Sequence, residues 1–286
     1  MSVASNNSPW GATTTPDLEE DDLLYFCKVI EDRAGISLKT SKRDLVRTRL
    51  RSRVTANGLD SYGDYRSYLA KIDKDDPEWE YFTNLLTTNK TDFFREPKHF
   101  EYLVQTILPE WLKTREKVFK VWSAASSTGE EPFTLAMVLS RHLPEGRDFK
   151  ILATDIDTEV LSTAQNSVYP ISKKTEIPVD YHTPCLDIGK GDARGWFRIK
   201  PHLRNKIVFK QHNLIDRTSP GNGVFDLVVC RNVLIYFSPD TIEFVQKKLQ
   251  STVKKDGHLF IGHSESFQGI SHSWSPVGPS VFKKGT

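Results

Sequence analysis

The chain has 286 residues, of which 38% are hydrophobic and 27% charged, proportions that are ordinary for a globular protein. That length accommodates one large domain and a smaller companion. The net charge of +2 argues against nucleic acid as the default partner, so any basic surface must be local. The three scattered cysteines, the lack of a long apolar stretch and the polar N-terminus predict a protein of a reducing compartment, which we expect to be the cytoplasm.

Helical periodicity dominates the first ninety residues. Residues 1–16 are polar and predict a flexible tail, and Thr15-Pro16-Asp17 at its end is typical of the start of a helix. Three more helices are expected, over residues 41–55 and 65–72 and after Asp76-Pro77. We therefore predict an all-α domain over residues 17–90.

The pattern changes after residue 90 to apolar strands that alternate with helices. Five strands are expected, over residues 118–122, 150–154, 206–210, 225–230 and 258–261. This alternation is typical of a parallel sheet covered on both faces. Residues 170–201 interrupt it with two short apolar runs around the loop GKGDARG, which predicts a small antiparallel insertion. The expected fold is thus α/β over residues 91–286, with a β-subdomain inserted at about 170–201.

Ligands of such sheets bind beyond the carboxyl ends of the strands. The segment after the first strand, WSAASSTGEEP, has one glycine rather than the dinucleotide pattern GxGxxG. Its two glutamates stand beside a helix N-terminus and would repel a pyrophosphate there, so the segment favours S-adenosylmethionine over NAD. The alternative is that the glutamates only interact favourably with the helix dipole. After the second strand, Asp155 is placed to accept ribose hydroxyls, whereas Asp157 is more simply the N-cap of the next helix.

Two further strand ends and one loop complete the expected site. Asn213 and Leu214 follow the third strand, where an amide and an apolar side chain suit an adenine edge. The segment CRNVLIYF after the fourth strand lacks the Asn/Asp-Pro-Pro-aromatic motif of many amino-group methyltransferases, which counts against N-methylation. The polar loop at residues 87–97 either caps helices or adds to the site. The eight histidines are dispersed without metal-binding spacing, so no metal is expected.

Taken together in this order, the segments TTNKTDFFRE, VWSAASSTGEEP, ATDID, FDLVVCRNVLIYF and GHLFIGHSESF resemble the CheR family of chemotaxis receptor glutamate methyltransferases. The resemblance extends from about Leu18 to near the C-terminus. It implies an all-α N-terminal domain and a Rossmann-like, S-adenosylmethionine-dependent methyltransferase domain with an inserted antiparallel β-subdomain. The implied substrate is a glutamate side chain of a helical bacterial chemoreceptor. Whether the insertion binds a peptide at the receptor's C-terminus stays open.

The resemblance also implies roles for individual residues. Arg95 and Tyr236 fall where the family has active-site groups near the transferred methyl. Cofactor contacts are implied for Asn89, Thr91, Arg95, Glu131, Asp155, Asn213, Leu214, Arg231 and Asn232. The basic second helix is expected to face the acidic methylation region of the receptor, with its arginines in solvent: Arg43, Arg47, Arg49, Arg51 and Arg53. The alternative is that this helix is only a solvated face.

The expected chemistry is simple, because a glutamate side chain has a pKa of about 4.3 and is already an anion at neutral pH. No general base is required, and the enzyme's expected task is to position the reactants in line and to exclude water. Two other functions stay open. One is a methyltransferase for a small molecule or nucleic acid, and the other is a non-catalytic protein that binds S-adenosylmethionine to regulate a partner.

Overall fold

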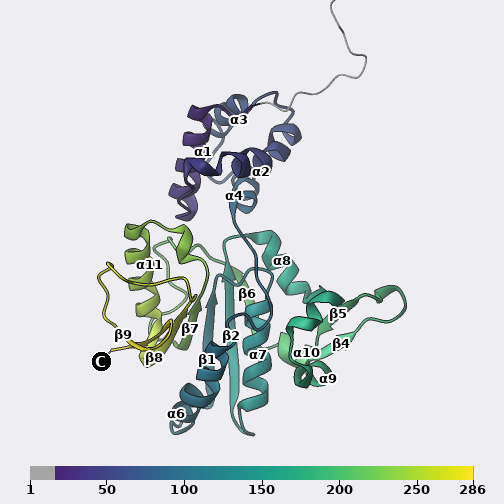
Figure 1. Ribbon diagram of the computed structural model, residues 1–286, viewed down its shortest axis with the longest axis vertical. Helices are drawn as coiled ribbons and strands as arrows, with labels where there is room; N and C mark the ends of the chain where they lie inside the picture. The colour runs from purple at the N-terminus through teal and green to yellow at the C-terminus, as the bar shows by residue number, and fades with distance from the viewer. Residues whose placement is uncertain (1–16, 286) are drawn as a thin grey trace, which may run out of the picture.

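The structure, a computed structural model, describes residues 17–285; the tail predicted at residues 1–16 lies outside them. A bundle of helices sits above an open sheet that has helices on both faces, and a small β-subdomain projects beside the sheet (Figure 1). Within residues 17–285, no helix combines the length and the apolar character needed to cross a membrane.

The bundle contains four α-helices and one short 3-10 helix: α1 (Glu20–Ala34), η1 (Thr40–Lys42), α2 (Arg43–Ala56), α3 (Tyr62–Leu69) and α4 (Glu78–Leu86). Their apolar faces pack into one core around the fully buried Phe26, Leu50 and Phe82. The all-α character predicted for this region is confirmed.

Two predicted helix starts are wrong. Helix α1 begins at Glu20, because the Asp17 carboxylate accepts the N–H of the buried Leu18 and keeps that segment outside the helix. Helix α3 begins at Tyr62 rather than Tyr65. The Ser61 hydroxyl accepts the Asp64 N–H and donates to its carboxylate, so that the helix starts one residue after Ser61.

The large sheet has seven strands in the order β6-β2-β1-β7-β8-β10-β9. Their bounds are β1 (Val118–Ala124), β2 (Asp148–Asp155), β6 (Ile207–Gln211), β7 (Phe225–Cys230), β8 (Val253–Ile261), β9 (Trp274–Gly278) and β10 (Val281–Lys284). The first five are parallel, whereas β10 runs antiparallel to its neighbours β8 and β9. From β1 the chain moves outward to β2 and β6, then returns to build β7 and β8 on the other side. The strand order therefore reverses between β1 and β7, where such sheets bind their ligands.

The side chains of β1 alternate between the two faces of the sheet, as the period of a strand requires. Phe119 and Val121 belong to the core on one side, which includes residues of α7 (Glu130–His142). Trp122 and Ala124 belong to the core on the other side, which includes residues of α11 (Pro239–Thr252). Helix α8 (Thr158–Asn166) follows β2. The α/β class is thus confirmed by a sheet buried on both faces.

The antiparallel insertion is also confirmed. It is a three-stranded sheet in the order β3-β5-β4. Its elements are β3 (Val168–Pro170), η3 (Ile171–Glu176), η4 (Val179–Tyr181), α9 (His182–Cys185), β4 (Leu186–Ile188), η5 (Gly191–Ala193) and β5 (Trp196–Ile199), followed by α10 (Pro201–Arg204).

Two features of the α/β part differ from expectation. The apolar spacing of residues 96–112 predicts one α-helix, and the structure has a continuous helical run that begins at Lys98 and contains a π-turn: α5 (Lys98–Tyr102), the π-turn (Leu103–Ile107) and α6 (Leu108–Leu112). The hairpin β9–β10 was not predicted, because Pro276 weakens its strand pattern. Proline is tolerated there because β9 is an edge strand.

Candidate active site

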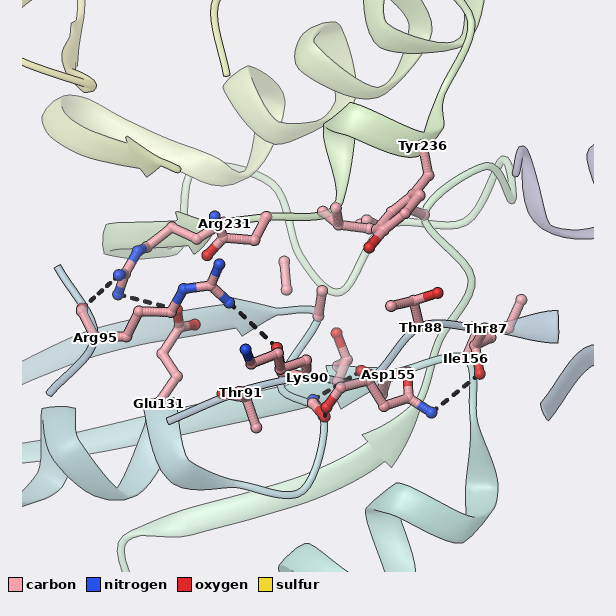
Figure 2. A pocket seen from close by; sticks show the side chains of 18 of the residues that line it. Thr87, Thr88, Lys90, Thr91, Arg95, Glu131, Asp155, Ile156, Arg231 and Tyr236 are labelled. Atoms are coloured by element: carbon pink, nitrogen blue, oxygen red, sulfur yellow. Dashed lines mark hydrogen bonds and ion pairs between the residues drawn. The ribbon is translucent and has the colours of Figure 1, made fainter. Parts of the chain in front are cut away.

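A pocket lies at the carboxyl ends of β1, β2, β6 and β7, and residues of the polar loop between α4 and α5 form part of its wall (Figure 2). It encloses about 950 Å³ of empty space, counting its open mouth. Its wall includes all ten residues predicted for cofactor binding and catalysis: Asn89, Thr91, Arg95, Glu131, Asp155, Asn213, Leu214, Arg231, Asn232 and Tyr236.

Asp155 occupies the end of β2 and is almost fully buried. Its carboxylate accepts the N–H of Ser127 at 2.8 Å and that of Asp157 at 3.0 Å, so the β1–α7 turn and its own strand end hold it in place. Burial raises the pKa of Asp155 to about 6, although the backbone donors act in the opposite direction. Asp157 is the N-cap of α8, as predicted, and accepts the N–H groups of Glu159 and Val160.

The turn between β1 and α7 approaches the insertion closely. Gly129 caps α7 at a φ of +97°, and a Cβ there would lie 2.9 Å from both Tyr169 Oη and Ala164 Cβ. The two glutamates that follow have different partners. Glu130 pairs with Lys173 of the insertion at 2.8 Å, whereas Glu131 accepts a hydrogen bond from the Ser123 hydroxyl at 2.7 Å and lines the pocket.

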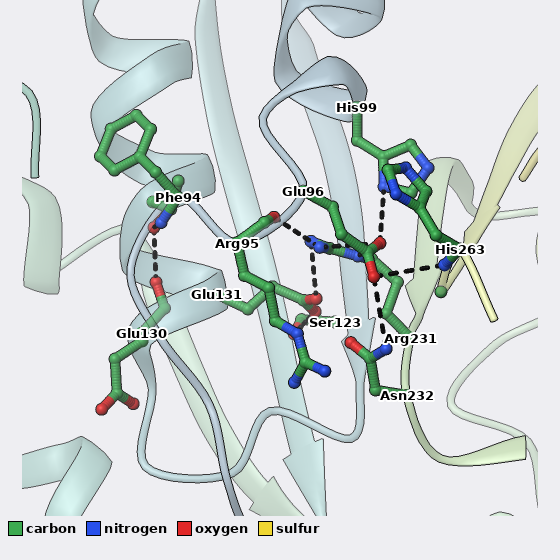
Figure 3. Close-up of polar contacts among 12 residues, drawn as sticks. Phe94, Arg95, Glu96, His99, Ser123, Glu130, Glu131, Arg231, Asn232 and His263 are labelled. Atoms are coloured by element: carbon green, nitrogen blue, oxygen red, sulfur yellow. Dashed lines mark hydrogen bonds and ion pairs between the residues drawn. The ribbon is translucent and has the colours of Figure 1, made fainter. Parts of the chain in front are cut away.

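Arg231 lines the pocket but is largely buried, and each of its three guanidinium nitrogens donates to a protein group (Figure 3). Its guanidinium lies 3.1 Å from a Glu96 carboxylate oxygen and 3.3 Å from one of Glu131, and it donates to the Arg95 carbonyl. Burial raises the pKa of Glu131, against the opposing effect of the Arg231 charge. Arg231 therefore ties together three segments around the pocket. Sequence reasoning missed Glu96, although the residue closes the motif TTNKTDFFRE.

A second carboxylate that the sequence analysis left without a role shapes the loop after β7. Glu265 accepts the N–H groups of Asn232 at 2.9 Å, Leu234 at 2.7 Å and Gly262. These bonds hold Asn232 at a φ of +58° and turn the chain into η6 (Leu234–Tyr236). Glu265 lies in the motif GHSESF, which was the signal available in the sequence.

Arg95 and Tyr236 reach the same space from distant segments. The Arg95 guanidinium donates to the Lys90 carbonyl at 3.2 Å and has no ion-pair partner among residues 17–285. Tyr236 comes from η6 and also packs against the helical core. Figure 2 shows the guanidinium and the phenol hydroxyl facing one pocket from different sides. A guanidinium without an ion-pair partner and a hydroxyl that face the same pocket can together hold a carboxylate by charge-assisted hydrogen bonds.

The two predicted amides are partly engaged within the protein. Asn89 donates to Asp157 at 2.6 Å, and Asn213 donates to the Arg33 carbonyl at 2.6 Å. Asn89 also donates to the Thr87 hydroxyl at 3.1 Å, so both N–H groups of its amide are used, whereas the second N–H of Asn213 has no partner among residues 17–285 and is available to a ligand. Leu214 is buried and adds apolar surface to the pocket.

The arginines of α2 do not all extend into solvent, which corrects one expectation. Arg53 pairs with Glu78, whose side chain is only 4% exposed, and Arg49 donates to the Thr87 carbonyl. The side chains of Arg43 and Arg47 are 37% and 39% exposed, and Arg51 is exposed. Arg53 and Arg49 therefore point toward the bundle, where they bind the Glu78 carboxylate and the Thr87 carbonyl. The basic surface that faces solvent is smaller than predicted.

Comparison with known proteins accounts for both parts of the chain. Residues 21–87 match the family described as "CheR methyltransferase, all-alpha domain", and residues 89–281 match "CheR methyltransferase, SAM binding domain". The chain is 40% identical to the chemotaxis protein methyltransferase of Salmonella typhimurium, over 93% of this chain and 90% of that protein. It is 37% identical to that of Escherichia coli (93% and 91% covered) and 34% identical to that of Borreliella burgdorferi (94% and 95% covered). On this evidence the chain belongs to the CheR methyltransferase family.

Proposed function

We propose that the protein is an S-adenosylmethionine-dependent glutamate O-methyltransferase that esterifies glutamate side chains in the cytoplasmic domain of a bacterial chemoreceptor. One observation carries the proposal. A single pocket contains a buried carboxylate suited to a ribose, Asp155, and a guanidinium without an ion-pair partner among residues 17–285, Arg95. The names of the relatives, all chemotaxis protein methyltransferases, support the biological setting.

The residues present fit the cofactor. The Asp155 carboxylate accepts two backbone N–H groups, and its remaining lone pairs can accept hydrogen bonds from ribose hydroxyls. Ala124 and Ala125 leave room for close approach along the β1–α7 turn, and Leu214 and Val233 add apolar surface for a purine. When bound, the cofactor supplies a methyl group activated by its positive sulfonium. The carboxylates of Asp155 and Glu131 favour such a cation over a pyrophosphate.

The protein's own residues position the acceptor. In this proposal Arg95 binds one oxygen of the substrate carboxylate and Tyr236 donates to the other, so that a lone pair points along the line of transfer. The substrate is already ionised at neutral pH, so neither residue has to remove a proton. Orientation of this kind can supply about 7–11 kcal/mol of a barrier. The Arg95 guanidinium is half-buried, which leaves the substrate anion oriented but still reactive.

We further propose that the receptor approaches over α2 and the insertion. The outward basic surface of α2 consists of the exposed Arg51, which has no ion-pair partner among residues 17–285, and of Arg43 and Arg47, which pair with Glu20 and Asp44; an acidic helical partner would compete for the latter two. The insertion exposes Ile188 and Trp196 next to its edge strand β4, which suits an extended receptor tail.

The test is incubation with methyl-labelled cofactor and a panel of chemoreceptor signalling domains. Label retained by the receptor and released by mild base is expected, because base hydrolyses methyl esters but leaves methylated amines intact. Label on a small molecule or nucleic acid, or tight cofactor binding without transfer to any receptor, would contradict the proposal.

A further inference from the structure

Three side chains with metal-binding chemistry meet beside the pocket without lining it. Glu96 lies two residues before α5, His99 is in its first turn, and His263 follows β8. One potential ligand atom from each lies within 4.8 Å of the other two. Figure 3 shows Glu96 between Arg231 on one side and the two imidazoles on the other.

His99 is the central observation, because its imidazole is 1% exposed and its polar neighbours, Glu96 at 3.5 Å from Nδ1 and the Pro279 backbone, leave neither ring nitrogen in a well-formed hydrogen bond among residues 17–285. One face stacks on Phe260 at 4.8 Å between ring centroids, and the ring of His263 approaches at 5.0 Å. A buried polar group without a partner is rare in native proteins and calls for an explanation, such as an ion. Burial and the Arg231 charge lower the pKa of His99 to about 4, so the ring is neutral near pH 7. Neutral imidazole is the form that binds metals.

The surrounding charge favours a dication. Glu96, Glu131 and Glu265 lie close enough to influence one another, and one guanidinium, that of Arg231, lies among them. The carboxyl groups thus outnumber the guanidinium, although burial raises the pKa of both Glu131 and Glu265. Burial raises the pKa of Glu96, but Arg231 and hydrogen bonds outweigh that effect and lower it; the Glu96 oxygen near His99 is also the one that pairs with Arg231 at 3.1 Å.

We propose that Glu96, His99 and His263 bind a divalent transition-metal ion of the borderline class represented by Zn²⁺. The Glu96 oxygen and His99 Nδ1 are 3.5 Å apart. Tetrahedral zinc with bonds of about 2.0–2.2 Å places its ligand atoms about 3.3–3.6 Å apart, which this pair already satisfies. His263 is exposed, so the ion can enter from solvent and the fourth position is open to water. Two imidazoles and one carboxylate form a donor set that Zn²⁺ prefers to Mg²⁺ or Ca²⁺.

The site departs from the expectation of no metal, because its ligands are separated by up to 167 positions and form no motif. Its place in the fold suggests its effect. Glu96 has a φ of +56° and Phe94 one of +53°, a strained backbone on both sides of Arg95. An ion bound by Glu96 would stabilise the backbone of residues 94–96 from the side opposite the pocket and would not displace the residues that line the pocket.

Zn²⁺ titration by calorimetry, on protein free of histidine tags, tests the proposal directly. The wild type should bind one equivalent, and His263→Ala should weaken that binding at least about 100-fold, since losing even an outer-sphere partner costs 10–100-fold. His202→Ala removes an exposed histidine on α10 and is the matched control, expected to bind as the wild type does. Absence of Zn²⁺ binding, or equal binding by wild type and His263→Ala, would overturn the proposal.

A second measurement identifies the ligands. Co²⁺ in the same site should give the intense visible absorption of a four-coordinate ion in the wild type and lose it in His263→Ala. His99→Gln should lose it as well, provided that circular dichroism shows a folded protein. A wild-type spectrum typical of six-coordinate, solvated Co²⁺ would mean that the ion binds elsewhere on the surface, and the proposal would fail.

Discussion

Asp155 should make cofactor affinity depend on pH. Burial raises its pKa to about 6, and the ionised carboxylate is the better acceptor for ribose hydroxyls. Affinity for S-adenosylhomocysteine should therefore be complete above about pH 6 and decrease as the pH falls through it. Asp155→Asn should weaken binding by about 1–3 kcal/mol and abolish this dependence between about pH 5 and 7. Calorimetry across that range checks both effects, and a variant that keeps the wild-type pH profile would remove Asp155 from the site.

Arg95 should act mainly on turnover. Because its guanidinium has no ion-pair partner among residues 17–285, its removal leaves no buried carboxylate uncompensated and the fold should persist. Arg95→Ala is expected to lower kcat by about 10²–10³-fold, as the loss of one positioned donor does in other enzymes. Arg95→Lys should recover part of the rate, since it retains the charge but not the planar geometry. Arg115→Ala, an exposed arginine outside the site, is the control, and a near-normal rate for Arg95→Ala would contradict the assignment.

At the scale of elements, α2 combines two kinds of arginine that mutation should separate. Arg53 compensates Glu78, which is nearly inaccessible to solvent and also accepts a hydrogen bond from Tyr65. Arg53→Ala should lower the free energy of unfolding by about 3 kcal/mol, because it leaves a buried carboxylate without its partner. Arg51→Ala, on the exposed side of the same helix, should change it by less than about 0.5 kcal/mol. Urea denaturation measures both values, and equal stabilities would show that the Arg53–Glu78 pair does not support the bundle.

The outward arginines of α2 should instead affect the receptor. Attraction between a basic helix and an acidic partner chiefly raises the association rate and weakens with salt, since the Debye length is about 8 Å at physiological ionic strength. Arg47→Glu combined with Arg51→Glu should raise the receptor KM markedly at low salt and leave the affinity for S-adenosylhomocysteine unchanged. Unaltered receptor kinetics at low salt would mean that these arginines are only a solvated face.

At the scale of the whole molecule, we expect a change in the insertion to affect binding of a receptor peptide without affecting binding of the cofactor in the pocket. The insertion contacts the pocket loop through Lys173, which donates to the Thr91 carbonyl, and Glu176, which accepts the Phe93 N–H at 2.8 Å. These contacts come from the middle and end of η3. The β4–β5 loop meets η3 at its first residue, Ile171, whose N–H donates to the Gly195 carbonyl at 2.8 Å, and the glycine of an Asn-Gly turn would keep that carbonyl. Replacing residues 190–195 with Asn-Gly should therefore weaken binding of a receptor tail peptide and spare cofactor affinity. Loss of cofactor binding in a folded variant would argue against this division.

The sequence by itself determined the architecture and the membership of the pocket. Strand–helix alternation specifies a parallel sheet, and the carboxyl ends of parallel strands meet at one edge. For this reason Asp155, Asn213 and Arg231 could be assigned to one pocket from their places after predicted strands, and all three line it. The N-cap of α8 could also be predicted, because Asp157 accepts the N–H groups of residues only two and three positions further along the chain.

Only the tertiary structure decided how distant charges are paired. Arg231 meets Glu96 across 135 positions, and Arg53 meets Glu78 across 25, although neither pairing follows from helical or strand period. The same holds for His99, whose burial against Phe260 and approach to His263 depend on how α5 packs on the end of β8. Periodicity reports which face of an element is buried. The partner that a buried charge meets depends on how the elements pack in three dimensions, and the spacing of residues along one element does not contain that information.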